Sequence, residues 1–137
     1  MRRVFADTFY WTALLYRRDP WHPHIAAFSQ TLADTDRVFT TDAVLTELLA
    51  ALSAAGARLR HEAVILVDEL LHDPQVLVVE ATRGLFLDGL SLYRDHPDKA
   101  YSLTDCMSMQ VMRREGLTDV LTNDRHFTQE GFHILFP

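Results

Sequence analysis

The sequence predicts an α/β fold around a short, mostly parallel central sheet. Short apolar runs alternate with longer segments that have helical character, as parallel sheets with crossover helices require. The runs are unbroken rather than alternating in polarity, which is expected of strands covered by helices on both faces. The expected strands cover residues 3–7, 38–40, 76–79, 120–122 and 133–136.

Helix signals occupy the intervals between these strands. Pro23 suits the first turn of a helix, and Thr41 suits the N-cap of another. Gly56 and Gly116 each follow an amphipathic segment and suit helix ends. The expected helices cover residues 8–16, 24–33, 42–55, 59–72, 82–94 and 103–115.

Length and composition predict a single domain over residues 1–137 with one core, and a cytoplasmic protein. No apolar stretch is long enough to span a bilayer. The apolar run after Arg3 stops at Asp7, so no signal peptide is expected. Cys106 is the only cysteine, which excludes an internal disulfide and favours a reducing compartment.

The net charge of −6 argues against a broad basic surface for nonspecific binding of nucleic acid. It does not exclude a nuclease, because bound cations can offset a local cluster of carboxylates.

Four carboxylates stand at positions that structural roles alone do not readily explain when all four are considered together. Asp7 and Asp124 each follow an apolar run, and the carboxyl ends of parallel strands are where such sheets bind ligands. Glu47 shares one face of its expected helix with Val44 and Leu48. Asp105 opens a Met-rich helix.

Each carboxylate also has a structural explanation when it is taken alone. Asp7 and Asp124 suit turns, and Glu47 would reach solvent if its helix were slightly rotated. Ser102 and Asp105 fit a capping box, a role that is compatible with a second one at a metal.

Taken together, four neighbouring carboxylates would repel one another unless a cation compensated for their charge. Hard oxygen ligands favour Mg²⁺ or Mn²⁺. Zinc would require cysteines and histidines at suitable spacing, and only His22 and His24, on either side of Pro23, come near this. The pattern therefore predicts a divalent-metal site.

Four segments make the chain resemble the PIN-domain family, and within it the VapC-type toxins of bacterial toxin–antitoxin pairs. The resemblance runs nearly end to end, and the third segment, with Ser-x-Thr-Asp-Cys, is the most specific. One small departure is Asn123, where a less polar residue is common. The segments are Phe5-Ala6-Asp7-Thr8, Thr41-Asp42-Ala43-Val44-Leu45-Thr46-Glu47-Leu48-Leu49, Asp98-Lys99-Ala100-Tyr101-Ser102-Leu103-Thr104-Asp105-Cys106 and Leu121-Thr122-Asn123-Asp124-Arg125-His126-Phe127.

The resemblance implies a three-layer α/β/α sandwich and a metal-dependent endoribonuclease. By match of motif, Asp7, Glu47, Asp105 and Asp124 would be the catalytic and metal-binding residues for Mg²⁺ or Mn²⁺. Asp7 and Asp105 would be the main direct ligands. Arg125 could hold a substrate phosphate or lie on the surface.

The family pattern also implies partners: an RNA substrate, a small antitoxin whose tail lies in a groove, and a second copy of the chain, because homodimers are common in the family. Four aromatic residues could line that groove or pack in the core. They are Tyr10, Trp11, Tyr16 and Trp21.

Three other functions stay open from the sequence. The chain could be a PIN-like module that binds without cleaving, or a housekeeping RNA-processing nuclease of the same fold. A phosphatase with Asp7 as nucleophile is a third reading, but a haloacid-dehalogenase-like enzyme would want a second Asp where Phe9 stands.

Overall fold

The structure is a computed structural model that describes residues 1–137. It contains five strands and seven helices. In chain order they are β1 (Arg3–Ala6), α1 (Thr8–Leu15), α2 (His22–Ser29), β2 (Arg37–Thr41), α3 (Asp42–Leu52), α4 (Ala57–His72), β3 (Val76–Val79), α5 (Arg83–Asp95), α6 (Leu103–Glu115), β4 (Asp119–Leu121), α7 (His126–Gln129) and β5 (His133–Ile134).

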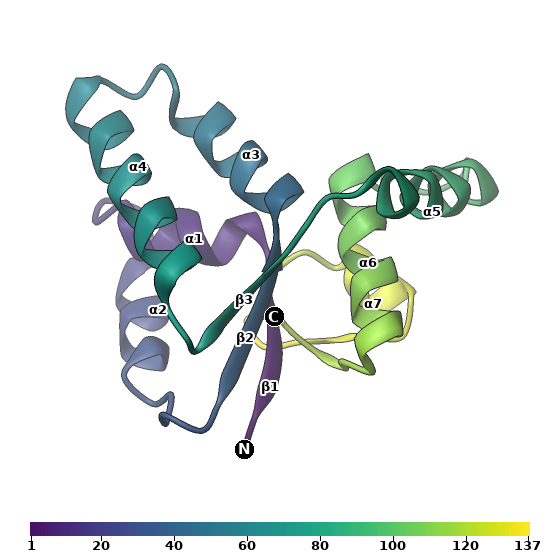
Figure 1. Ribbon diagram of the computed structural model, residues 1–137, viewed down its shortest axis with the longest axis horizontal. Coiled ribbons are helices and arrows are strands. Elements are labelled where there is room, and N and C mark those ends of the chain that lie inside the picture. The colour runs from purple at the N-terminus through teal and green to yellow at the C-terminus, as the bar shows by residue number, and fades with distance from the viewer.

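The five strands form one sheet in the order β3-β2-β1-β4-β5, and every neighbouring pair is parallel. Helices α1 to α4 lie on one side of the sheet and α5 to α7 on the other, which makes three layers (Figure 1). This confirms the predicted α/β/α architecture. The strand order reverses between β1 and β4, the kind of switch point where open α/β sheets bind ligands.

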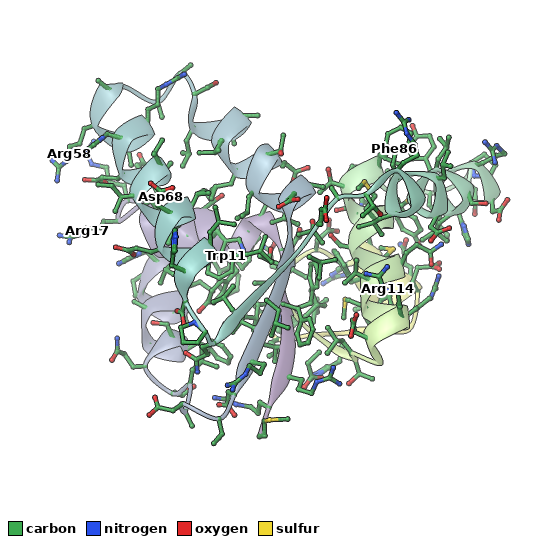
Figure 2. The ribbon with its side chains drawn as sticks, viewed as in Figure 1. Trp11, Arg17, Arg58, Asp68, Phe86 and Arg114 are labelled. Carbon is green, nitrogen blue, oxygen red and sulfur yellow. The ribbon has the colours of Figure 1, made fainter.

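The central strand β1 is buried because helices cover both of its faces. Val4, Phe5 and Ala6 are at most 1% exposed, and Tyr10 and Trp11 of α1 are buried beside them. Trp11 points into the interior between the sheet and the helices, whereas Arg17 and Arg58 lie at the surface (Figure 2). The core therefore runs through the middle of the sheet and holds its carboxyl edge in place.

Local signals in the sequence explain several helix ends. The Thr41 hydroxyl accepts a hydrogen bond from the Val44 N–H at 3.1 Å, as an N-cap should. Gly116 adopts the left-handed conformation, with φ +67°, at the end of α6. Both roles were predicted from the sequence.

Most predicted ranges differ from the observed ones by one or two residues, and the clearest differences concern three helices. Helix α3 ends at Leu52, and Gly56, with φ +98°, is instead the N-cap of α4, so it joins two helices rather than ending one. Helix α2 begins at His22 and ends at Ser29, earlier than expected at both ends. Helix α7 was missed, because four residues are too few to show a helical period.

None of the helices combines the length and the apolar character that crossing a bilayer would take.

Candidate metal centre

The carboxyl edge of the sheet, next to the switch point between β1 and β4, gathers the acidic side chains. Asp7 follows β1, Asp124 follows β4, Glu47 lies in α3 and Asp105 in the first turn of α6. Helices α3 and α6 belong to opposite layers and contact each other near this edge (Figure 1). Four separate elements therefore contribute one carboxylate each.

Asp7 is the most enclosed of the four, with 5% of its surface exposed. Ala6 pairs with Leu121 in the sheet, so the residues that follow them lie side by side. The Thr122 hydroxyl accordingly donates a hydrogen bond to Asp7 Oδ2 at 3.1 Å. The other carboxylate oxygen, Oδ1, is buried without any hydrogen-bond partner.

This environment disfavours the charged form of Asp7. Burial is the main cause, and the nearby charges of Asp105 and Glu47 add to it, although the neighbouring Thr8 N–H and the hydrogen bond from Thr122 act in the opposite direction. The pKa of Asp7 rises from 3.8 to about 7. A buried carboxylate with an unpaired oxygen and a raised pKa is poised to gain from a cation.

Glu47 lies on the apolar face of α3 without being fully enclosed. Its neighbours Val44 and Leu48 are completely buried, while Glu47 itself is half-buried. The Thr8 hydroxyl donates a hydrogen bond to Glu47 Oε1 at 2.6 Å, which holds the carboxylate toward the start of α1. Its charge is the smallest of the causes that raise the pKa values of Asp7 and Asp105, so it lies near enough to act on both carboxylates.

Asp105 is 8% exposed, and its side chain and its backbone N–H both bind Ser102. Its Oδ2 accepts a hydrogen bond from the Ser102 N–H at 3.0 Å, and its own N–H donates to the Ser102 hydroxyl at 3.0 Å. This is the predicted capping box, and it orients the side chain rigidly. Burial is the largest cause that raises the pKa of Asp105, and the charges of Asp124 and Glu47 contribute as well.

Asp124 is half-buried in the loop between β4 and α7. Its N–H donates to the Thr122 hydroxyl at 3.1 Å, and its Oδ1 accepts from the His126 N–H at 2.9 Å. Thr122 therefore connects two of the four predicted residues, since the same hydroxyl also donates to Asp7. Thr122 was not among the site residues predicted from the sequence, although its place directly after a buried strand was a signal for it.

His126 is a second residue that was not singled out. Its Nδ1 lies 3.3 Å from Asp124 Oδ1 and 3.6 Å from Asp105 Oδ2. This nitrogen atom is buried and has no hydrogen-bond partner. One ligand atom from each of these three residues lies within 4.8 Å of the other two. Asp7 and Glu47 act on this group electrostatically but do not belong to that tight triad.

The residues at this edge fit a divalent cation. They offer carboxylate oxygens from four elements, an imidazole nitrogen, and a buried oxygen of Asp7 that nothing in the protein satisfies. A cation would relieve both the repulsion among the carboxylates and the unpaired oxygen.

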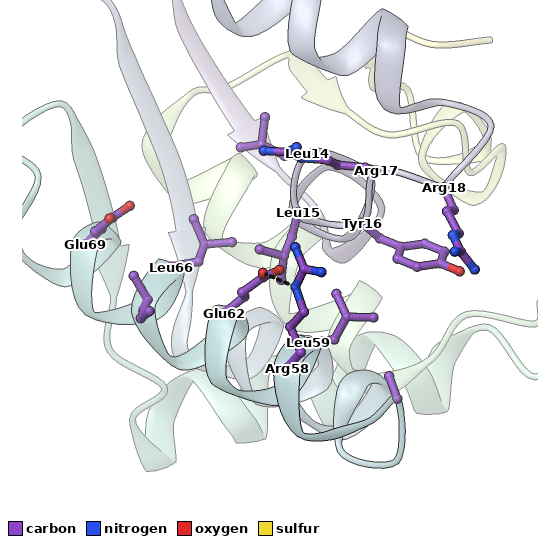
Figure 3. Close-up of a pocket in the computed structure, with 12 residues that line it drawn as sticks. Leu14, Leu15, Tyr16, Arg17, Arg18, Arg58, Leu59, Glu62, Leu66 and Glu69 are labelled. Atoms are coloured by element: carbon purple, nitrogen blue, oxygen red, sulfur yellow. Dashed lines mark hydrogen bonds and ion pairs between the residues drawn. The ribbon is translucent and has the colours of Figure 1, made fainter.

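A cavity lies elsewhere in the structure, away from these carboxylates. It has a volume of about 740 Å³ and is bounded by the end of α1, the loop that follows it, and α4 (Figure 3). Tyr16 lines it, but Tyr10 and Trp11 are buried in the core and Trp21 packs against Phe9. Of the four aromatic residues proposed for a groove, only Tyr16 therefore lines this cavity.

Comparison with known proteins identifies the same fold. The family model described as PIN domain matches residues 4–132. VapC20 of Mycobacterium tuberculosis, a toxin that cleaves the sarcin–ricin loop, superposes with a TM-score of 0.83 at 26% identity, over 95% of this chain and 96% of that one. No curated protein sequence matches the chain.

Two more distant structures share the fold. FitAcB from Neisseria gonorrhoeae is 15% identical with a TM-score of 0.65, over 96% of this chain and 95% of that one. VapBC2 from Rickettsia felis, solved with a DNA fragment from its promoter, is 11% identical with a TM-score of 0.65, over 96% of each chain.

Proposed function

The chain belongs to the PIN-domain family, and from that membership we propose that it is a divalent-metal-dependent endoribonuclease, the toxin of a toxin–antitoxin pair. One observation is the main support for metal-dependent chemistry. Asp7 is buried with an unpaired oxygen and faces the charges of Asp105 and Glu47, an arrangement that costs stability unless a cation is present. We expect Mg²⁺ or Mn²⁺, because the donors are mostly carboxylate oxygens.

The proposed roles follow from how each side chain is held. Asp7 and Asp105 are the main ligands, fixed by Thr122 and by the capping box with Ser102. Glu47 and Asp124 complete the site, directly or through water. When bound, the cation supplies positive charge that polarises the scissile phosphate and makes water a stronger nucleophile.

Arg125 is available to a substrate phosphate. It follows Asp124 directly, its side chain is exposed, and it forms no ion pair within the protein. An Arg guanidinium binds phosphate oxygens in a bidentate manner, so Arg125 would anchor RNA beside the carboxylates. In-line attack by water would displace the 3′ oxygen and leave a 5′ phosphate on the downstream product.

The groove beside α1 and α4 suits the expected antitoxin. Leu14, Leu15 and Leu66 give it an apolar lining, and Arg17 and Arg18 stand at its edge without ion pairs (Figure 3). Because Glu62 and Glu69 also line the groove, an amphipathic segment would complement this surface with acidic side chains placed opposite Arg17 and Arg18. Such a partner, an RNA substrate and a lone buried Cys106 all agree with a cytoplasmic protein.

Cleavage of RNA with Mg²⁺ or Mn²⁺ tests this function. We expect 5′-phosphate products from the wild type, no cleavage with EDTA, and at least about a 100-fold loss in Asp7→Asn and Asp105→Asn, beyond what changes around a metal ligand cost. Asp36→Asn is the matched control, because Asp36 is an equally buried aspartate that lies away from the site. If Asp7→Asn cleaves as fast as the wild type with the same metal response, the mechanism is wrong.

A further inference from the structure

His126 stands at the candidate metal centre in a way that a structural histidine would not. Its backbone N–H binds Asp124, but its Nδ1 atom is buried and has no hydrogen-bond partner. Nδ1 lies within 3.6 Å of oxygens from both Asp105 and Asp124. If the imidazole served only to pair with these carboxylates, an N–H directed at one of their oxygens would be expected, and neither contact has hydrogen-bond geometry.

The two separations from Nδ1 are close to those of atoms that share one cation. An octahedral ion with bonds of about 2.1 Å holds adjacent ligand atoms roughly 3 Å apart. The distances from Nδ1 are 3.3 Å to Asp124 Oδ1 and 3.6 Å to Asp105 Oδ2. Small side-chain movements would therefore place all three atoms on one ion.

The imidazole is held in this position by packing on its other side. The ring of Tyr101 meets the His126 ring edge-on, with 5.4 Å between centroids. The Tyr101 hydroxyl donates to Glu130 at 2.9 Å, and Arg113 donates to the same carboxylate at 2.7 Å. This packing restricts the orientations that the His126 ring can adopt.

A separate observation indicates that a cation belongs here. Asp7 is 5% exposed, and its Oδ1 is unpaired although the charge of Asp105 lies close by. No basic side chain of the protein forms an ion pair with Asp7, whereas Asp105 and Asp124 each have His126 Nδ1 within 3.6 Å.

We propose that His126 coordinates the metal through Nδ1, so that the centre is a mixed carboxylate–imidazole site. This inference rests on the proposed metal dependence and extends it to selectivity. An imidazole ligand favours transition metals, whereas Mg²⁺ prefers oxygen alone. Mn²⁺ should therefore bind more tightly than Mg²⁺, and His126 should supply the difference.

Electron spin-echo spectroscopy of the full chain loaded with Mn²⁺, without RNA, tests the coordination. The wild type should show modulation from a directly bound ¹⁴N nucleus, and labelling histidines with ¹⁵N should shift it. His126→Phe retains a ring against Tyr101 but lacks the nitrogen, so the modulation should vanish. His133→Asn, which changes an exposed histidine paired with Asp119, is the control and should retain it.

Calorimetric titration with each metal gives a second measurement. His126→Phe should lose Mn²⁺ affinity by about tenfold or more, while its Mg²⁺ affinity changes much less. Absence of ¹⁴N modulation in the wild type overturns the inference even if the variant fails to fold, and so does modulation that persists in His126→Phe.

These results are separable from the proposed function. Cleavage of RNA by a Mn²⁺-loaded protein without bound nitrogen would leave the nuclease intact and remove His126 from the ligand set. Bound nitrogen in a protein that cleaves no RNA would support the ligand and contradict the nuclease.

Discussion

Asp7 and Asp36 are equally buried, each with 5% of its surface exposed, but they lie at opposite ends of the parallel sheet. Asp36 precedes β2 and accepts hydrogen bonds from the Arg2 N–H at 2.7 Å and the Ala33 N–H at 2.9 Å. Its second contact with Arg2 is an ion pair at 3.4 Å. Asp7 has one side-chain donor, Thr122, and an oxygen with no partner.

The consequences for ionisation are opposite. The N–H groups of Arg2 and Ala33 hold the pKa of Asp36 below its usual 3.8, whereas burial raises the pKa of Asp7 to about 7. Asp36 is thus a carboxylate whose charge the fold stabilises. The fold instead destabilises the charged form of Asp7. We attribute this difference in pKa between the two aspartates to the metal that the site of Asp7 is proposed to bind.

The largest expected effect is on the stability of the metal-free protein. Because the folded-state pKa of Asp7 lies above its usual 3.8, the folded protein retains a proton that the unfolded chain has lost. Stability should therefore fall as pH rises from about 4 through about 7. Asp7→Asn should remove this loss and stabilise the protein by a few kcal/mol above pH 7.

Asp36→Asn should have the opposite sign. The lowered pKa of Asp36 contributes stability that is complete above its usual 3.8 and is lost only as pH falls through the lowered value. Its substitution should therefore reduce the melting temperature at neutral pH. Denaturant unfolding of both variants between pH 4 and pH 8 measures the contrast, and parallel curves for the two would contradict it.

A smaller effect should follow the addition of metal. At a free concentration of Mn²⁺ 100 times its Kd, linkage should raise the free energy of unfolding of the wild type by about 2.7 kcal/mol. Asp7→Asn should gain far less, because it has lost a ligand, while Asp36→Asn should gain as much as the wild type. Melting curves with and without metal at pH 7.5 test this, and equal gains in all three proteins would refute it.

The smallest expected effect is a difference in pH dependence between substitutions of two threonines that lie on either side of β1. Thr40 donates to the Ala6 carbonyl oxygen and accepts from the Trp11 indole N–H, whereas Thr122 donates to Asp7. Each Thr→Val change should cost about 1–3 kcal/mol, because buried polar groups lose their partners. Only the cost of Thr122→Val should grow as pH rises through about 7, where Asp7 ionises.

The Asp7→Asn background provides the control for this comparison. There, the pH dependence of the Thr122→Val cost should disappear, while the cost of Thr40→Val stays unchanged. Equal pH dependence for both threonines would show that Thr122 supports the fold rather than the charge of Asp7.

Much of the fold could be read from local patterns. The unbroken apolar run Val4-Phe5-Ala6 predicts a buried parallel strand, and Ser102 with Asp105 predicts the start of α6; the structure confirms both. Such patterns could not predict helix α7 or the exact end of α3. A four-residue helix has no visible period, and Gly56 suits the end of one helix as well as the start of the next.

For the site, neighbours along the chain are enough to show which carboxylates stand at strand ends or on an apolar helix face. The surroundings of these carboxylates depend on residues that only folding brings close. The register of β1 against β4 brings Thr122 to Asp7, and the turn after β4 places His126 Nδ1 3.6 Å from Asp105 Oδ2. These contacts join residues up to 115 positions apart, a separation at which local propensity carries no information.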